Sequence, residues 1–151
     1  MPATSKGFRY PQGTDNTNLA QYYQNLATDV DGYLNGIQAT IGYATGWSTL
    51  AGGYPALQAF KLANLCVVYG VIANTNAYSA AQTPVSSSLP AAYRPSKGVM
   101  VHGGVQIGVT AALQSCRFDV NPGGTITVSP NTTIAANSFH TFTAVYPLVL
   151  L

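Results

Sequence analysis

From residue 41 onward, the sequence is built from short runs of Val, Ile, Thr, Tyr and Phe that glycine and proline repeatedly interrupt. β-Branched and aromatic residues favour pleated sheet, whereas glycine and proline end regular elements. Many short runs separated in this way are typical of an antiparallel sandwich or barrel. We therefore predict strands near residues 44–50, 57–63, 65–73, 98–102, 105–113, 115–120, 124–129 and 138–149.

Two segments show the strand pattern most clearly. Residues 119–128 read DVNPGGTITV, in which Asn-Pro-Gly-Gly supplies a hairpin turn and apolar residues then alternate with threonine. In the last strand, one predicted face carries Phe139, Thr141, Thr143 and Val145, and the other carries His140, Phe142, Ala144 and Tyr146. Because neither face is charged, the pattern is compatible with both faces being covered.

A helix is predicted over about residues 16–38. Residues 15–18 offer N-cap side chains, and the apolar positions that follow are spaced 4, 3, 4, 3 and 4, as in a heptad seam. This spacing fits either a helix packed on its own domain or a short helical bundle that needs a docking partner, since Gly32 and Gly36 each cost about 1 kcal/mol relative to Ala. We predict a trimer interface at Leu19, Tyr23, Leu26, Val30, Tyr33 and Ile37.

The chain therefore divides into two predicted parts. Residues 1–15 are rich in turn formers and are expected to form an extended docking arm. Residues 1–40 would then hold this arm and the trimerisation helix, and residues 41–151 the head. The predicted fold is mainly β: an arm and a short α-helix, followed by an antiparallel, jelly-roll-like β-sandwich.

Two motifs resemble bacteriophage minor tail and appendage proteins. Residues 88–101, SLPAAYRPSKGVMV, are similar to the segment before a strand in the head domains of tail fibres, and a GGTITV strand follows. Residues 7–34, GFRYPQGTDNTNLAQYYQNLATDVDGYL, resemble the N-termini of such appendages. The resemblance implies a virion protein, usually homotrimeric, with an N-terminal attachment segment and a receptor-binding-like head. The chain lacks the fibre shaft of longer relatives.

The segment around Pro90 and Pro95 is predicted to be a rigid, extended bridge, because proline fixes its own φ and keeps the preceding residue extended. Tyr93 and Arg94 would project from the bridge. We expect Arg94 to reach a carboxylate or carbonyl of its own chain or of a neighbouring subunit.

Charge is scarce: charged residues make up 7% of the 151 residues, against about 25% in typical soluble domains. Two interpretations fit, a surface of neutral polar residues or a surface largely covered by partner subunits, and we favour the second. The six basic residues are scattered and form no patch for nucleic acid. The longest apolar run, residues 62–73, is shorter than the about 20 residues of a membrane span, and no secretory signal is recognisable.

The sequence gives little support for catalysis, and we expect no enzyme and no cofactor. The glycan hydrolase alternative needs two carboxylates about 5–9.5 Å apart, but only Asp119 lies in the β region. Asp29 and Asp31 are interpreted as a solvated helix face rather than a metal site. His102 and His140 are hydrogen-bonded residues or, alternatively, metal ligands on a three-fold axis. Cys66 and Cys116 are small buried residues or a disulfide pair.

Aromatic residues supply the candidate ligand site. Tyr43, Trp47 and Tyr54 stand among glycines, where their rings can stack on a sugar or can fill the core or a subunit interface. We predict a virion structural protein made in the host cytoplasm, a trimeric tail or capsid appendage that contributes to adhesion to host-surface glycan. Its residues 1–40 would bind other virion proteins. The alternative is a purely structural or decoration protein without receptor binding.

Overall fold

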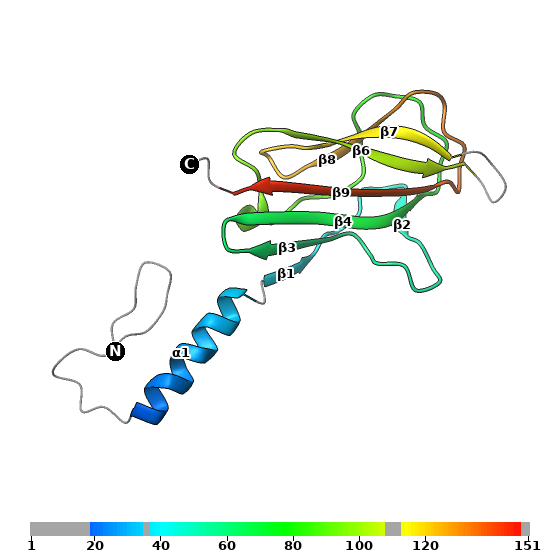
Figure 1. Cartoon of the computed structure of the whole chain (residues 1–151). Helices are drawn as coiled ribbons and strands as arrows, with labels where there is room; N and C mark the ends of the chain where they lie inside the picture. Colours follow the sequence, from blue (N-terminus) through cyan, green and yellow to red (C-terminus); the bar gives the residue numbers. More distant parts are fainter. Residues whose placement is uncertain (1–18, 35–36, 108–112, 149–151) are drawn as a thin grey trace. The chain divides into compact units, whose positions relative to one another are not determined.

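The computed structural model describes residues 19–34, 37–107 and 113–148. The chain divides into two compact units, residues 1–37 and 38–151. The first unit contains the helix α1 (Leu19–Leu34), and the second contains the β-sheet (Figure 1). The predicted arm, residues 1–15, lies outside the described residues. Among the described residues, no helix has the length and apolar character needed to cross a membrane.

Helix α1 is shorter than predicted at its C-terminal end. Ile37, expected to be the last seam position, is the first residue of strand β1 (Ile37–Thr40), which lies beside β3 in the sheet. Strand pairing therefore overrides a heptad pattern that already carried two helix-weakening glycines. Within the described side chains of the seam, Tyr23 is 63% exposed, Val30 is exposed and Leu26 is half-buried.

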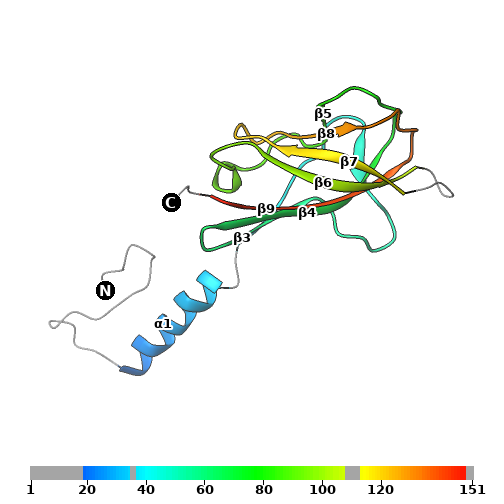
Figure 2. The ribbon, with the colours of Figure 1, turned by 45° about the horizontal axis from the view of Figure 1, so that its top comes forward.

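The second unit is a nine-stranded sheet with the order β1-β3-β4-β9-β6-β7-β8-β5, in which β2 also pairs with β4 (Figures 1 and 2). The pairings of β2 to β9 are antiparallel. The remaining elements are β2 (Trp47–Thr49), β3 (Gln58–Leu62), β4 (Leu65–Asn74), β5 (Thr83–Pro84), the 3₁₀ turn η1 (Ala91–Tyr93), β6 (Val99–Gln106), β7 (Leu113–Val120), β8 (Ile126–Pro130) and β9 (Phe139–Pro147).

Strand β9 joins the two halves of this sheet. It pairs along its whole length with β4, but with β6 only over residues 139–141. The sheet therefore curls at this junction, and its halves face each other across the core. Phe118 of β7 stacks on Phe142 of β9 with ring centroids 4.2 Å apart. The prediction of a mainly β, antiparallel fold is confirmed.

The core lies on the inner face of the curled sheet. Along β9, the side chains His140, Phe142, Ala144 and Tyr146 are buried, and the intervening positions are mostly exposed. The chain itself thus covers one of the two predicted faces and leaves the other open. Removal of the apolar inner face from water supplies the main stabilisation, at about 25 cal/mol per Å².

One predicted strand boundary is wrong. The sequence indicated separate strands at 98–102 and 105–113, with a break at the glycine pair, but β6 runs continuously through Gly103 and Gly104. A Cβ atom on Gly103 would lie only 2.5 Å from the Phe118 ring and 2.7 Å from the Thr141 carbonyl oxygen. This glycine therefore serves close packing within a strand and not a turn.

The hairpin at 119–128 is confirmed. Gly124 adopts φ +94° and donates its N–H to the Asn121 carbonyl at 2.8 Å, and the Asn121 N–H donates to the Thr125 carbonyl at 3.0 Å. A left-handed backbone of this kind favours glycine. The Asn121 side chain also donates to the Thr125 carbonyl, at 3.1 Å.

The bridge around Pro90 and Pro95 differs in part from its prediction. It contains the turn η1, and Tyr93 is buried rather than projecting, with its carbonyl accepting a 2.6 Å hydrogen bond from the Tyr146 hydroxyl. Tyr93 differs from the prediction because its large aromatic ring is more stable when it is buried in the core. Arg94 does reach a carbonyl of its own chain, since its Nε donates to Leu89 at 2.8 Å.

Candidate functional site

A cavity of about 490 Å³ opens on the outer face of the curled sheet, where β4, β9 and β6 meet. Its floor includes Val71, Thr141 and Gly104, which lie side by side on these three strands. The next row of the floor contains Phe139 and Gln106, which are register partners. Leu113, at the start of β7, completes one wall. We refer to this space as the outer cavity.

The rim of the outer cavity is formed by residues 50–57, between β2 and β3. Both strands pair with the same edge of β4, so that the chain between them leaves the sheet as a loop (Figure 1). Gly52 and Gly53 have positive φ values of 97° and 86°, which favour glycine. They place Leu50 and Tyr54 at the cavity, and the Tyr54 side chain remains 57% exposed.

A second, smaller cavity of about 200 Å³ lies beside Trp47. The Trp47 ring is 8% exposed and packs against Tyr78 and His140, with centroids 5.4 and 5.1 Å away. Asn74 also lines this cavity, but its side-chain amide already makes hydrogen bonds within the protein, to the Asn76 and Ala135 carbonyls. The smaller cavity therefore lies at the edge of the core: Trp47 and Asn74 are buried, whereas Thr45, Asn76 and Ala77 are exposed.

The predicted aromatic residues do not meet in one cavity. Trp47 lines the smaller cavity, whereas Tyr54 lines the outer cavity. Tyr43 is half-buried, and its hydroxyl accepts a hydrogen bond from the Leu57 N–H at 3.0 Å. Sequence reasoning missed Gln106 and Thr141, because the pairing of β6 with β9 brings them together and no local pattern indicates that pairing.

The two histidines lie in opposite environments. His140 is fully buried, and its Nε2 is 2.6 Å from the Tyr78 hydroxyl. Burial lowers the pKa of His140 to about 4, so the ring is neutral at physiological pH and its Nε2 shares a hydrogen bond with the Tyr78 hydroxyl. His102 is exposed on β6. The described residues contain no group of three His, Cys, Asp or Glu side chains placed to hold a metal ion.

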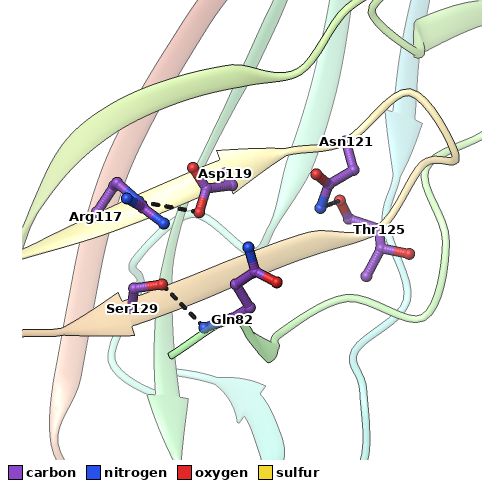
Figure 3. A network of polar contacts seen from close by, with 6 residues as sticks. All are labelled: Gln82, Arg117, Asp119, Asn121, Thr125 and Ser129. Carbon is purple, nitrogen blue, oxygen red and sulfur yellow. Dashed lines mark hydrogen bonds and ion pairs between the residues drawn. The ribbon is translucent and has the colours of Figure 1, made fainter. Parts of the chain in front are cut away.

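A charged cluster lies on the outer face of β7 and β8 (Figure 3). Arg117 and Asp119 form an ion pair at 3.1 Å, and Ser129, the register partner of Arg117, accepts a hydrogen bond from the Gln82 N–H at 2.9 Å. Asp119 is the only acidic side chain in residues 38–151. One carboxylate cannot supply both members of the acid–base pair that glycoside hydrolysis generally uses.

Both cysteines are free and buried. Cys66 is opposite Tyr146 in the sheet, and Cys116 is opposite Gly103. Burial raises the pKa of Cys116 to about 11 and raises that of Cys66 as well. Since the thiolate is the reactive form, these thiols act as packing groups rather than nucleophiles.

Comparison with known proteins finds similarity at the level of solved structures. No protein-family model matches the chain, and no curated protein matches it. Among solved structures, it is similar to the head domain of lactococcal phage bIL170, which is described as a receptor-binding domain. The two are 20% identical with a TM-score of 0.57, and the match covers 76% of this chain and 99% of that domain. The predicted resemblance to phage appendage heads is thus confirmed at the level of fold: the chain has the fold of a phage receptor-binding head domain.

Proposed function

We propose that this chain is a phage virion protein, a homotrimeric tail or capsid appendage whose head binds saccharide on the host-cell surface. The observation that carries the proposal is the structural match, which spans 99% of a receptor-binding head domain rather than a fragment of it. The outer cavity supports adhesion, because it offers an aromatic ring and neutral polar side chains at the surface. Residues 1–40 would attach the head to other virion proteins.

Helix α1 supports the proposed trimer. Tyr23, Leu26 and Val30 share a seam, and Tyr23 and Val30 are exposed in the single chain. Light scattering of the purified protein should give about three times the 15.8 kDa of one chain. Leu26→Asp places a charge in the seam and should reduce the mass to that of a monomer. Thr28→Asp, at an exposed position on the opposite side of the helix, is the control and should keep the trimer mass.

Adhesion can be tested with the fluorescently labelled full chain on a panel of bacterial cells that begins with lactococcal strains. We expect binding to some strains that is lost when their surface saccharide is oxidised with periodate and is inhibited by saccharide extracted from the same cells. Absence of binding by the assembled protein across the panel would favour the decoration-protein alternative. Release of reducing sugar from bound cells would instead favour an enzyme.

A further inference from the structure

We infer that the outer cavity is a binding site for one uncharged sugar unit, with Tyr54, Gln106 and Thr141 as its recognition residues. This inference rests on the proposed adhesive function and specifies the class of saccharide and the place where it binds. It is argued from the size of the cavity, from the chemistry of its lining and from the glycine in its floor.

The size of the outer cavity suits a small molecule. Its volume of about 490 Å³ lies within the roughly 300–1,000 Å³ that is common for ligand pockets. Five of the strands and loops of the sheet supply its walls, including the paired strands β4, β9 and β6. A floor made of hydrogen-bonded strands holds the lining side chains in fixed relative positions, as a preformed binding site requires.

The lining is uncharged. None of the described residues around the cavity is Asp, Glu, Lys or Arg, and His140, which also borders it, is neutral above about pH 4. A phosphate or carboxylate ligand would lose water here without gaining a partner of opposite charge, which is costly. Arg117, which could pair with such a group, lies outside the cavity. The lining therefore selects a neutral ligand.

The polar groups in the cavity match hydroxyl groups. The side chains of Gln106 and Thr141 lie on neighbouring strands and make no hydrogen bond to the described part of the chain. An amide and a hydroxyl can each donate and accept, as sugar hydroxyls do. A purely apolar occupant would bury these groups without partners, at a cost of about 1–3 kcal/mol for each fully buried group.

The exposed ring of Tyr54 supplies an apolar surface on which a sugar ring can stack. Aromatic rings combine a large apolar surface with a polar tip, so that they can cover the C–H face of a pyranose while hydroxyls point elsewhere. Leu50 and Val71 extend this apolar surface along the wall and floor. A ring on one side and two hydrogen-bonding side chains below it together indicate a sugar rather than a peptide side chain.

Gly104 keeps the floor of the cavity open. A Cβ atom at this position would meet only Thr141 Cγ2, at 3.5 Å, which is an ordinary contact. Alanine should therefore be accommodated, whereas a branched side chain would extend into the space that the ligand needs. Gly104→Ala and Gly104→Val thus form a matched pair: both remove the glycine, but only valine fills space in the cavity.

The inference can be tested by NMR titration of the isotope-labelled full chain with methyl glycosides of glucose, galactose, rhamnose and N-acetylglucosamine, and with glycerol phosphate as an anionic probe. We expect at least one neutral glycoside to shift the amide signals of Gly104, Gln106 and Thr141, and glycerol phosphate to leave them unchanged. Tyr54→Ala and Gly104→Val should each weaken binding about tenfold or more, which corresponds to about 1.4 kcal/mol. Met100→Gln, at a 70% exposed residue on the same strand, should bind as the native chain does, and Gly104→Ala should weaken binding less than Gly104→Val does.

The outcomes separate this inference from the proposed function. Shifts centred on Arg117 and Asp119, or retained affinity in Gly104→Val, would overturn the cavity as the binding site while leaving adhesion intact. If no neutral glycoside shifts the cavity signals although the native chain binds cells, the sugar assignment is wrong and the adhesive function stands. If the native chain binds neither cells nor glycosides, both are wrong.

Discussion

The inner and outer faces of the curled sheet are built from similar residues, but the chain treats them differently. On β9, Phe142 and Ala144 of the inner face are at most 3% exposed, whereas Val145 of the outer face is 57% exposed. On β4, Val68 is fully buried, but Leu65 on the other face is 48% exposed. Apolar character alone therefore does not mark the core of this protein.

This difference teaches where stability and function lie. The inner face is tightly packed around Gly103, and the Tyr78 hydroxyl and His140 Nε2 form a hydrogen bond there. The outer face contains the outer cavity and the charged cluster, and it tolerates exposed apolar and neutral side chains. We expect changes on the inner face to act on folding, and changes on the outer face to act on binding.

We expect the largest difference in the free energy of unfolding between substitutions at the two adjacent glycines of β6, Gly103 and Gly104. Gly103→Ala places a methyl group within 2.7 Å of the Phe118 ring and of a backbone carbonyl, which cannot move without distorting β9. We expect it to lower the free energy of unfolding by about 3 kcal/mol or more. Gly104→Ala meets one side-chain atom at 3.5 Å and should change the free energy by less than about 1 kcal/mol.

Urea denaturation followed by tryptophan fluorescence measures both variants, since Trp47 lies in the aromatic cluster of the core. If Gly103→Ala is too unstable to purify, Phe118→Leu together with Gly103→Ala supplies a second measurement, because the smaller side chain should relieve the clash and partly restore stability. Equal costs at positions 103 and 104 would contradict the assignment of Gly103 to the inner face.

The buried histidine should make stability depend on pH. The pKa of His140 is about 4 in the folded chain, against 6.5 for the free side chain, so between these values only the unfolded chain binds this proton. Stability from this group is therefore full above about pH 6.5 and is lost as the pH falls to 4, by about 3 kcal/mol in total. Urea titrations at pH 7 and pH 4 measure the loss.

The exposed histidine provides the control for this experiment. His140→Gln retains a group that can accept the Tyr78 hydroxyl and should remove most of the loss between pH 7 and pH 4. His102→Gln alters an exposed side chain on β6 and should leave the loss as large as in the native chain. The assignment would be wrong if the two variants showed the same pH dependence.

Much of the fold could be predicted because the information is local. Alternation and turn chemistry located β8 and β9 and the hairpin that ends at Gly124. The break predicted inside β6 failed because Gly103 is required by Phe118, a residue of the neighbouring strand. The helix was predicted too long because Ile37 pairs in the sheet as part of β1. Helix propensity describes the local sequence only and does not include this competing strand pairing.

The candidate site was less predictable for the same physical reason. The sequence indicated Tyr54 as a candidate sugar-binding residue, but it indicated Trp47 equally, and Trp47 is buried in the core. Gln106 and Thr141 meet only because β6 and β9 pair over three residues at the curl of the sheet. That pairing is non-local, and so the cavity it creates leaves no signature in either strand alone.

Two tyrosine hydroxyls extend the comparison to single hydrogen bonds. On the inner face, the Tyr146 hydroxyl donates to the Tyr93 carbonyl at 2.6 Å, and both groups are buried. Tyr146→Phe should lower the free energy of unfolding by about 1–2 kcal/mol, because the carbonyl loses its partner away from water. On the outer face, Tyr69→Phe removes a partly buried 3.2 Å bond to Gln58 and should cost less than about 1 kcal/mol, since water can replace it. Denaturant midpoints of the two variants measure the difference, and a larger loss for Tyr69→Phe would contradict it.

The ion pair of the outer face should have the smallest effect on folding. Arg117 and Asp119 lie 3.1 Å apart, and their side chains are 45% and 11% exposed. Water screens such a pair, so Arg117→Gln should lower the free energy of unfolding by less than about 1 kcal/mol, and by less still at 1 M salt. The same denaturation series measures it at low and high salt. A loss of 3 kcal/mol would mean that the Asp119 carboxylate behaves as a buried charge left without its partner. In that case, the part of the outer face over β7 and β8 would belong energetically with the core, and the division between a folding face and a binding face would hold only for β3, β4, β6 and β9.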